Sequence, residues 1–283
     1  MTVLEVIQKS SDFLAKRGVD SARLQTELLL AHVLKLPRMK LYLNFERKLS
    51  DTELGSIREL VKRRGQREPL QHITGSTSFC GLEMAVNRHV LVPRPETELL
   101  AEAGWQFLST IHSQPSTALD FGTGSGCIAI ALAAKCPAAR IVALDVSEEA
   151  LAVAKQNAAI NGVSEQTEFL HEDGLRALPT DSRFDLFISN PPYIATAEIA
   201  TLQPEVRDFD PRGALDGGAD GLDFYRMLAD QAGHFLKPEG KIMLEFGDGQ
   251  ADGIKRMFES QKWVVEAVRE DYTRRPRILV ARR

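Results

Sequence analysis

The sequence is poor in cysteine: among 283 residues only Cys80, Cys127 and Cys136 occur, and no two of them form a Cys-X-X-Cys pair. This odd number and spacing argue against a disulfide framework and against a zinc site. The longest apolar run covers only residues 127–134, whereas a membrane-spanning helix needs about 20 residues. The first ten residues contain no hydrophobic signal core. We therefore expect a cytoplasmic protein with no metal centre and no membrane partner.

Charge is unevenly distributed along the chain. Residues 1–90 contain 15 Lys and Arg against 10 Asp and Glu, a net +5, whereas the remainder contains 20 against 29, a net −9. A basic region attached to an acidic one suggests an anionic partner for the former. A solvated basic surface is an equally good interpretation, because the basic cluster at residues 62–67, which includes Arg64, falls at an expected exposed helix end.

Apolar residues recur at helical spacing up to about residue 67, as in Leu24, Leu28 and Leu29. Breaks at Gly18, at Pro37 and around residue 50 divide this region into several short helices, which predicts a small helical bundle. Turn signals after residue 68 separate short β-prone runs and predict a β-hairpin. We expect a helical N-terminal domain for substrate docking at residues 1–75, a β-hairpin linker at 76–93 and a larger domain at 94–283.

From residue 97 onward, strand patterns alternate with helix patterns, which predicts an α/β domain whose parallel sheet is covered by helices on both faces. The last two strands are joined by a short loop and should form an antiparallel hairpin at the sheet edge. A seven-stranded sheet of this kind looks like the class I methyltransferase fold, which is Rossmann-like. The expected strands cover residues 117–121, 140–146, 168–172, 184–189, 241–246, 263–269 and 277–281.

A glycine-rich turn, Asp120-Phe121-Gly122-Thr123-Gly124-Ser125-Gly126, closes one apolar strand and opens a helix. Its glycines let the backbone turn tightly and approach a ligand without an intervening Cβ. A Rossmann dehydrogenase is the obvious competitor, but its fingerprint has Gly or Ala where this chain has Cys127. The GxGxG spacing is the form seen in methyltransferases. The predicted cofactor-binding residues are therefore Gly122, Thr123, Gly124, Ser125 and Gly126.

Two acidic residues extend this predicted cofactor site. Asp145, at the end of the next strand, can accept hydrogen bonds from both ribose hydroxyls of an adenosyl group. Its alternative role is an N-terminal charge for the following helix, which Ser147 would cap. Asp173 lies in the loop after the third strand and can accept from an adenine amino group, although a solvated loop acid is an equally good interpretation. The glycine turn and Asp145 together indicate a nucleoside cofactor.

The motif Asn190-Pro191-Pro192-Tyr193 follows the fourth strand, where ligands bind in open α/β sheets. A planar amide nitrogen is a poor nucleophile, so it needs acceptors for its N–H groups and a desolvated, in-line approach. The Asn190 side-chain oxygen and the Pro191 carbonyl can accept, the prolines stiffen the turn, and Tyr193 can stack on a flat substrate. The motif alone predicts methylation of a planar nitrogen in DNA adenine, an RNA base or a glutamine amide.

Three further segments, at residues 67–75, 92–98 and 209–222, narrow this choice. With the helical N-terminal domain and Glu245-Phe246-Gly247, they resemble the release factor glutamine methyltransferases, the PrmC or HemK family, across essentially the whole chain. The resemblance implies N5-methylation of the glutamine in the Gly-Gly-Gln motif of class I peptide-chain release factors. It places S-adenosylmethionine at residues 122–126 and Asp145, and the glutamine amide at residues 190–193, so that Asn190 borders both.

The chain departs from the family pattern at Gly174, where some members have an aromatic residue. Gly174 is retained in the predicted cofactor site, but adenine stacking is not expected from it. Arg94, Glu96 and Glu98 either line the reaction pocket or complement the charge of the helix that follows them. The glycine-rich loop at residues 217–221 either closes over a bound peptide or is an ordinary surface loop.

Two other classes of function remain open. A methyltransferase acting on DNA adenine or an RNA base would need a basic recognition region and would bind with steep salt dependence. The acidic larger domain counts against it, so no direct nucleic-acid partner is expected. A non-enzymatic sensor of the adenosyl cofactor is disfavoured by the intact Asn190 motif beside an intact glycine turn.

Overall fold

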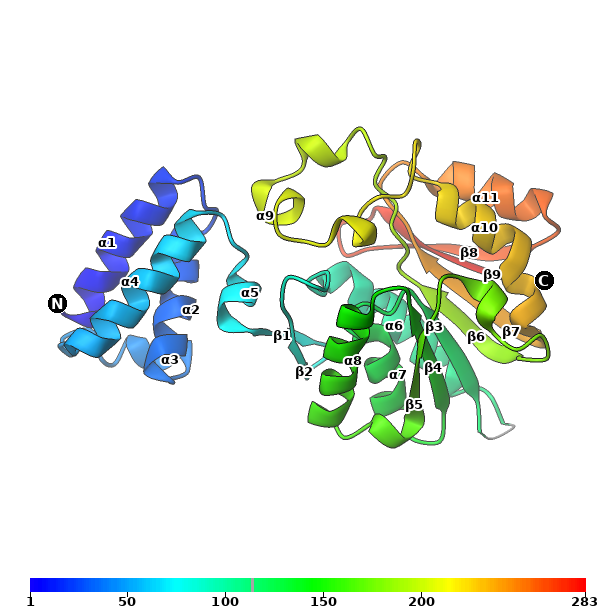
Figure 1. The fold of residues 1–283 in the computed structure, drawn as a ribbon, viewed down its shortest axis with the longest axis horizontal. Coiled ribbons are helices and arrows are strands. Elements are labelled where there is room, and N and C mark those ends of the chain that lie inside the picture. Colours follow the sequence, from blue (N-terminus) through cyan, green and yellow to red (C-terminus); the bar gives the residue numbers. More distant parts are fainter. Residues whose placement is uncertain (113–114) are drawn as a thin grey trace. The chain divides into compact units, whose positions relative to one another are not determined.

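The computed structural model describes residues 1–112 and 115–283, and it divides into two compact units (Figure 1). One unit comprises Met1–Gly75 together with Gln203–Phe209, and the other comprises Ser76–Leu202 and Asp210–Arg283. Each unit buries a hydrophobic core of its own.

The first unit is a bundle of short helices, as predicted. Its two longest amphipathic helices each begin with a capping box, in which Thr2 and Ser50 exchange hydrogen bonds with the residue three positions later. Val3, Leu29 and Ile57, from three different helices, are almost fully buried in one cluster. The helices are α1 (Val3–Lys16), α2 (Ala22–Leu34), α3 (Arg38–Leu41), α4 (Asp51–Gly65) and α5 (Leu70–Thr74).

The segment Gln203–Phe209 belongs to this bundle although it is distant in sequence. Glu205, in the short helix α9 (Pro204–Arg207), accepts from Arg64 at 2.6 Å and from Arg67 at 2.5 Å. Arg64 is only 3% exposed, so the expectation of an exposed basic helix end is wrong for this residue. A buried guanidinium needs a charged partner, and Glu205 supplies it.

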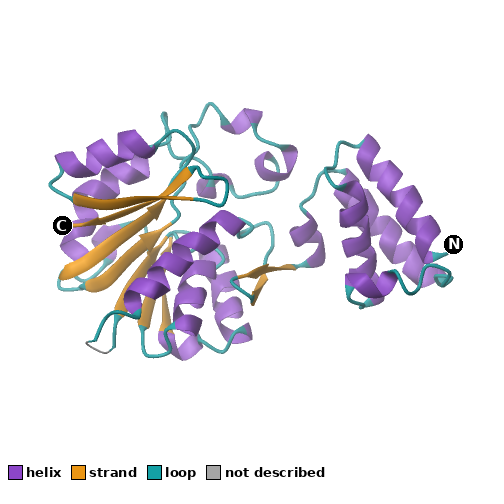
Figure 2. Ribbon diagram, turned by 180° about the vertical axis from the view of Figure 1, so that it is seen from behind, coloured by secondary structure: helices purple, strands orange, loops and turns teal. Residues whose placement is uncertain are grey.

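The second unit contains a seven-stranded sheet of order β5-β4-β3-β6-β7-β9-β8, with helices on both faces (Figure 2). Strands β3 to β7 run parallel, whereas β9 is antiparallel to both β7 and β8. The predicted fold class and its edge hairpin are therefore confirmed. The strands are β3 (Thr117–Phe121), β4 (Arg140–Asp145), β5 (Thr167–His171), β6 (Phe184–Ser189), β7 (Leu236–Glu245), β8 (Val264–Glu270) and β9 (Pro276–Arg282).

Alternate residues of the buried strands supply the two faces of this sheet. Leu186 and Ile188 of β6 pack with α6 and α7, whereas Phe187 between them packs with α10 and α11. The predicted hairpin is present as β1 (Ser76–Phe79) and β2 (Leu82–Ala85). The helices are α6 (Pro95–Leu108), α7 (Cys127–Lys135), α8 (Glu148–Ile160), α10 (Asp223–Gln231) and α11 (Ala251–Ser260), with 3-10 turns η1 (Ser164–Gln166), η2 (Leu175–Ala177), η3 (Ile199–Thr201), η4 (Arg212–Ala214) and η5 (Ala232–Phe235).

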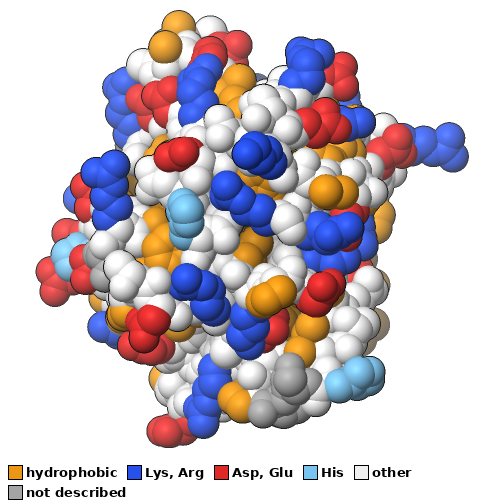
Figure 3. Space-filling view, turned by 90° about the vertical axis from the view of Figure 1, so that its right-hand side faces the viewer, with side chains coloured by type: hydrophobic (Ala, Val, Ile, Leu, Met, Phe, Trp, Pro, Cys, Tyr) orange, Lys and Arg blue, Asp and Glu red, His pale blue; other side chains and the backbone are white. Residues whose placement is uncertain are grey.

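The surface carries charges of both signs. On the face shown in Figure 3, basic and acidic side chains are interspersed, and apolar side chains are scattered among them. Within the described residues, no helix is both long and apolar enough to cross a membrane.

We expect Gly126→Ala to destabilise the second unit by about 2 kcal/mol, because φ is +80° there and the new Cβ would lie 3.0 Å from the Cβ of Ala154. The matched control is Gly253→Ala in α11, where a Cβ meets no atom within 4 Å and should stabilise by about 0.5–1 kcal/mol. Trp105 and Trp263, the two tryptophans of the chain, both lie in this unit, so urea unfolding followed by tryptophan fluorescence measures both changes. Equal stability of the two variants would contradict a requirement for glycine at position 126.

Candidate active site

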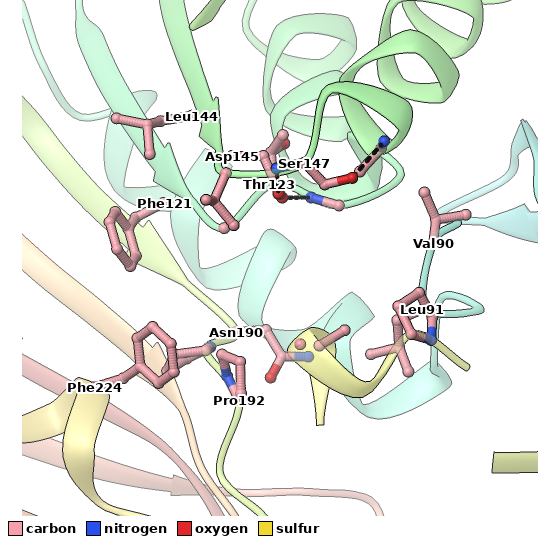
Figure 4. Close-up of a pocket in the computed structure, with 18 of the residues that line it drawn as sticks. Val90, Leu91, Phe121, Thr123, Leu144, Asp145, Ser147, Asn190, Pro192 and Phe224 are labelled. Atoms are coloured by element: carbon pink, nitrogen blue, oxygen red, sulfur yellow. Dashed lines mark hydrogen bonds between the residues drawn. The ribbon is translucent and has the colours of Figure 1, made fainter. Parts of the chain in front are cut away.

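A cavity of about 530 Å³ lies in the second unit, at the carboxyl ends of the parallel strands (Figure 4). The chain passes from β3 outward to β5 and then returns to β6 on the other side of β3. Such a reversal in strand order is where open α/β sheets bind ligands. The lining residues are drawn from seven segments, not all of whose residues reach the cavity: 89–97, the glycine turn, 144–150, 172–176, 190–192, 211–214 and α10.

The glycine turn is pinned to the neighbouring strand through its backbone. The N–H groups of Gly122 and Thr123 both donate to the carbonyl of Leu144 in β4, at 2.9 and 3.0 Å. Gly122 and Gly124 have φ of +71° and +55°, and a Cβ on either would meet no atom within 4 Å. Both glycines line the cavity, so the turn offers bare backbone to a ligand.

The carboxyl of Asp120 holds this turn from beneath. It is fully buried, and its Oδ2 accepts from the Thr123 hydroxyl at 2.6 Å and from the Ala129 N–H at 3.1 Å. Burial raises the pKa of Asp120 to about 7, and the hydrogen bonds from Thr123 and Ala129 oppose the rise. The Thr123 hydroxyl is therefore committed to the protein, although Thr123 borders the cavity.

The remaining residues of the turn also bind to the protein. Ser125 is 3% exposed, and its carbonyl accepts from the side chain of Asn157 at 2.9 Å. Gly126 precedes α7 and packs closely against Ala154 of α8. Of the predicted cofactor residues in the described chain, Gly126 is not among those that line the cavity.

Asp145 lies at the end of β4, facing the cavity (Figure 4). Its Oδ2 accepts from the Gly124 N–H at 2.8 Å, and its Oδ1 accepts from the Ser147 N–H at 2.9 Å. Each carboxylate oxygen retains a lone pair for a further donor. Asp173 and Gly174 also line the cavity; Asp173 is exposed, and Gly174 has a φ of +91° that favours glycine.

Asn190, Pro191 and Pro192 line the cavity directly after β6. The Asn190 Nδ2 donates to the Thr97 hydroxyl at 3.1 Å. Tyr193 is not among the described lining residues, because its ring packs on the core shared with α10 and α11. Burial is the main reason that the pKa of Tyr193 is raised to about 12.

The glycine-rich loop at residues 217–221 packs against this turn. A Cβ on Gly217 would lie 2.8 Å from the Pro192 carbonyl, and one on Gly221 would collide with the Tyr193 carbonyl. The Gln250 side chain donates to the same Tyr193 carbonyl at 2.9 Å and accepts from the Gly247 N–H at 2.8 Å. Gly217 and Gly221 therefore permit close packing against the turn, and closure over a peptide, one of the two alternatives for this loop, is not needed to explain them.

The three charged residues before α6 have different surroundings. Arg94 lines the cavity and donates to the buried Asp210 at 3.0 Å. Burial raises the pKa of Asp210 to about 6, and the charge of Arg94 opposes the rise. Glu98 instead accepts from the Cys80 N–H at 2.6 Å in the β1–β2 turn. Neither Glu98 nor Glu96 is among the described residues that line the cavity.

Sequence reasoning missed several lining residues. Thr97 lay within a segment already singled out, but nothing marked its hydroxyl as the partner of Asn190. The others are mostly apolar side chains that local sequence cannot distinguish from core residues, because only tertiary packing brings them to the cavity. They include Val90, Leu91, Phe224 and Met227.

Comparisons with known proteins agree with this arrangement. Residues 5–75 match the PrmC N-terminal domain, and residues 100–204 match the methyltransferase small domain. Over 259 residues the chain is 46% identical to the release factor glutamine methyltransferase of Geobacter sulfurreducens, covering 91% of this chain and 88% of that one. A release factor glutamine methyltransferase from Chlorobaculum tepidum is 43% identical over 280 residues, covering 96% and 94%.

The chain belongs to the release factor glutamine methyltransferase family. The family confirms the predicted class of enzyme. A solved methyltransferase from Pyrococcus furiosus shares the fold, with 19% identity, a TM-score of 0.53 and coverage of 78% of this chain and 97% of that chain.

The cavity of this family member fits S-adenosylmethionine, its methyl donor. A volume of about 530 Å³ falls in the usual range for cofactor sites, and its walls include Phe121, Leu144 and Leu175. The bare backbone of the glycine turn permits close approach of the cofactor, and the remaining lone pairs of Asp145 suit the ribose hydroxyls of its adenosyl group. Among the residues that the structure describes, no group of three or more His, Cys, Asp or Glu side chains is placed to hold a metal ion.

We expect Asp145→Asn to weaken S-adenosylmethionine binding by about 10- to 100-fold, because a charge-assisted hydrogen bond contributes about 1.5–3 kcal/mol. Isothermal titration calorimetry measures this loss. Glu148→Gln, an exposed neutralisation at the start of α8, should leave the affinity unchanged. A similar loss in both variants would indicate a general charge effect and not a contact from Asp145.

Proposed function

We propose that this protein transfers a methyl group from S-adenosylmethionine to the side-chain amide nitrogen, N5, of the glutamine in the Gly-Gly-Gln motif of class I peptide-chain release factors. The observation that carries the proposal is the placement of Asn190 and Pro191 on the wall of the same cavity as the glycine turn. Membership of the release factor glutamine methyltransferase family supports the choice of a release factor glutamine as the methyl acceptor. We place this activity in the cytoplasm, with no direct nucleic-acid or membrane partner.

The cofactor-binding residues follow from the geometry of the cavity. The glycine turn would hold the methionine end through its exposed backbone, and Asp145 would accept from the ribose hydroxyls. Asp173 and Gly174 would border the adenine. S-adenosylmethionine supplies an activated methyl group on a sulfonium centre.

The chain itself orients the acceptor. The Asn190 Oδ1 and the Pro191 carbonyl would accept from the two N–H groups of the glutamine amide and fix its nitrogen in line with the methyl group. Pro191 and Pro192 have no N–H groups that could compete, and they stiffen the turn. Tyr193, packed on the core, supports the turn from below. The amide nitrogen would form a bond to the methyl carbon as the bond from that carbon to the sulfonium sulfur breaks. S-adenosylhomocysteine would be the leaving group, and the nitrogen would lose one proton to solvent.

The helical unit would dock another part of the release factor. A groove of about 330 Å³ between α1 and α4 has an apolar floor that includes Val6, Phe13 and Ile57. Three basic side chains, Lys9, Arg58 and Lys62, and no acidic ones occur among the described residues that line it. This groove suits an acidic surface with exposed apolar side chains, and we propose that the release factor provides it.

Methyl transfer to purified, unmodified class I release factor tests the proposed function. Label from S-adenosyl-[methyl-³H]methionine should enter the wild-type factor, and should be absent when the Gly-Gly-Gln glutamine is replaced. Asn190→Ala enzyme should be slower by about 10²-fold or more, because removal of one preorganised hydrogen-bonding group costs about that much. Label on a DNA duplex, or equal label on both release factors, would overturn the proposal in favour of another planar nitrogen.

Charge reversal tests the docking groove. Lys9→Glu and Arg58→Glu should each raise KM for the intact release factor by up to about tenfold at low salt, because each replaces attraction by repulsion at the rim. The same variants should methylate a short Gly-Gly-Gln peptide at the wild-type rate. Lys40→Glu, exposed on α3 outside the groove, is the matched control. An unchanged KM in the groove variants would rule out this surface.

A further inference from the structure

An asparagine side chain offers an acceptor on one side and two donors on the other. Only the Oδ1 of Asn190 can accept from a substrate amide N–H, so a rotation of the side-chain amide by 180° would replace attraction with a clash of N–H groups. The proposed function, on which this inference rests, therefore requires something that fixes the orientation of Asn190.

Thr97 provides one such contact. It lies in the first turn of α6, is 3% exposed, and accepts from the Asn190 Nδ2 at 3.1 Å. A hydroxyl can accept from Asn190 while it donates its single hydrogen elsewhere.

Glu245 lies beside the same pair. It ends β7, whose Leu244 pairs with Ser189 of β6, so Glu245 and Asn190 are neighbours at the ends of adjacent strands. The Glu245 side chain is almost fully buried, and its Oε2 has no hydrogen-bond partner within the described residues. An ionised carboxylate only accepts hydrogen bonds, and both Thr97 and Asn190 lower the pKa of Glu245, which favours its charged form.

We propose that Glu245 and Thr97 are positioning residues: they occupy the N–H groups of the Asn190 side chain and thereby turn its Oδ1 toward the substrate amide. The direction of each hydrogen bond follows from the ionised carboxylate. Because Glu245 can only accept, Thr97 donates to it, and the Thr97 oxygen is left to accept from Asn190. The arrangement therefore specifies one orientation of the amide.

The arrangement depends on pH. Burial raises the pKa of Glu245 to about 7, while Thr97, Arg277 and Asn190 favour its charged form. Below that pH the carboxyl of Glu245 is protonated and gains an O–H donor. This donor opposes the N–H groups of Asn190, so the side-chain amide of Asn190 is no longer held in one orientation. The turnover rate should therefore fall as the pH decreases through about 7. Glu245 also interacts electrostatically with other titratable groups, namely Glu96 of α6, Cys127 of α7, Tyr193 after β6 and Tyr225 of α10.

Glu245→Gln tests this inference in the full-length enzyme. The variant keeps the side-chain volume but presents N–H donors to Asn190, so we expect kcat to fall about 10²-fold and its acid limb near pH 7 to disappear. The affinity for S-adenosylmethionine should change less than about twofold, which separates positioning from a folding defect. Thr97→Val should also lower kcat, whereas Thr97→Ser, which retains the hydroxyl, should restore most of it.

A spectroscopic readout makes the test independent of the substrate. The side-chain ¹H–¹⁵N resonances of Asn190, assigned by their loss in Asn190→Ala, should titrate with an apparent pKa near 7 in the wild type and not in Glu245→Gln. Glu266→Gln, a carboxyl of β8 paired with Lys241, is the control and should leave both readouts unchanged. The inference would be overturned if the Asn190 side-chain resonances of the wild-type enzyme did not titrate, or if Glu245→Gln kept the wild-type kcat. Failure of the wild-type enzyme to label release factor would instead count against the proposed function alone.

Discussion

A single buried amide connects the elements that enclose the cavity. Asn157 of α8 is fully buried; its Nδ2 donates to the carbonyls of Ser125 and Ala85, and its Oδ1 accepts from the Ala85 N–H. The glycine turn, the end of the β1–β2 hairpin and the helix after β4 are thus held at one point. Loss of this amide would leave buried backbone groups without partners, at a cost of about 1–3 kcal/mol for each group. The cavity wall formed by the residues after the hairpin depends on this constraint.

Buried carboxyls support several segments of the cavity wall, including the glycine turn. Asp120, Asp210 and Glu245 each lie under a segment that lines or borders it, and each has one oxygen without a hydrogen-bond partner among the described residues. Burial raises the pKa of all three, because a charge in a poorly hydrated site is unfavourable. These buried carboxyls lower the stability of the folded protein but fix the geometry of the segments above them, as is common near reacting centres. Apolar replacements would pack there at lower cost but would leave the turns without anchors.

The spacing of apolar residues in the sequence predicted the strands and helices that depend on local periodicity. The strands of the sheet and the terminal hairpin follow from side-chain alternation, and the structure has them close to their expected positions, except that β7 begins at residue 236 and not at 241. The pairing of Arg64 with Glu205 joins residues that are far apart in sequence, and no local pattern encodes it. The same limit applies to Thr97, whose role appears only when the ends of α6 and β6 meet. The position of the Tyr193 ring likewise depends on tertiary packing, because an aromatic residue after a strand suits a cavity and a core equally well.

The turn after β6 selects its methyl acceptor through the N–H donors that it does not present to the cavity. Pro191 and Pro192 contribute no N–H, and the carbonyl of Tyr193 is already bound by Gln250. The donors of Asn190 face Thr97 and, in our proposal, Glu245, so the turn presents acceptors to the cavity. A planar group with two N–H donors satisfies those acceptors, whereas a carbonyl or a carboxylate in the same place would face lone pairs. The chemistry of the turn therefore favours a primary amide or an exocyclic amino group. Selection between these two substrates must come from other parts of the protein.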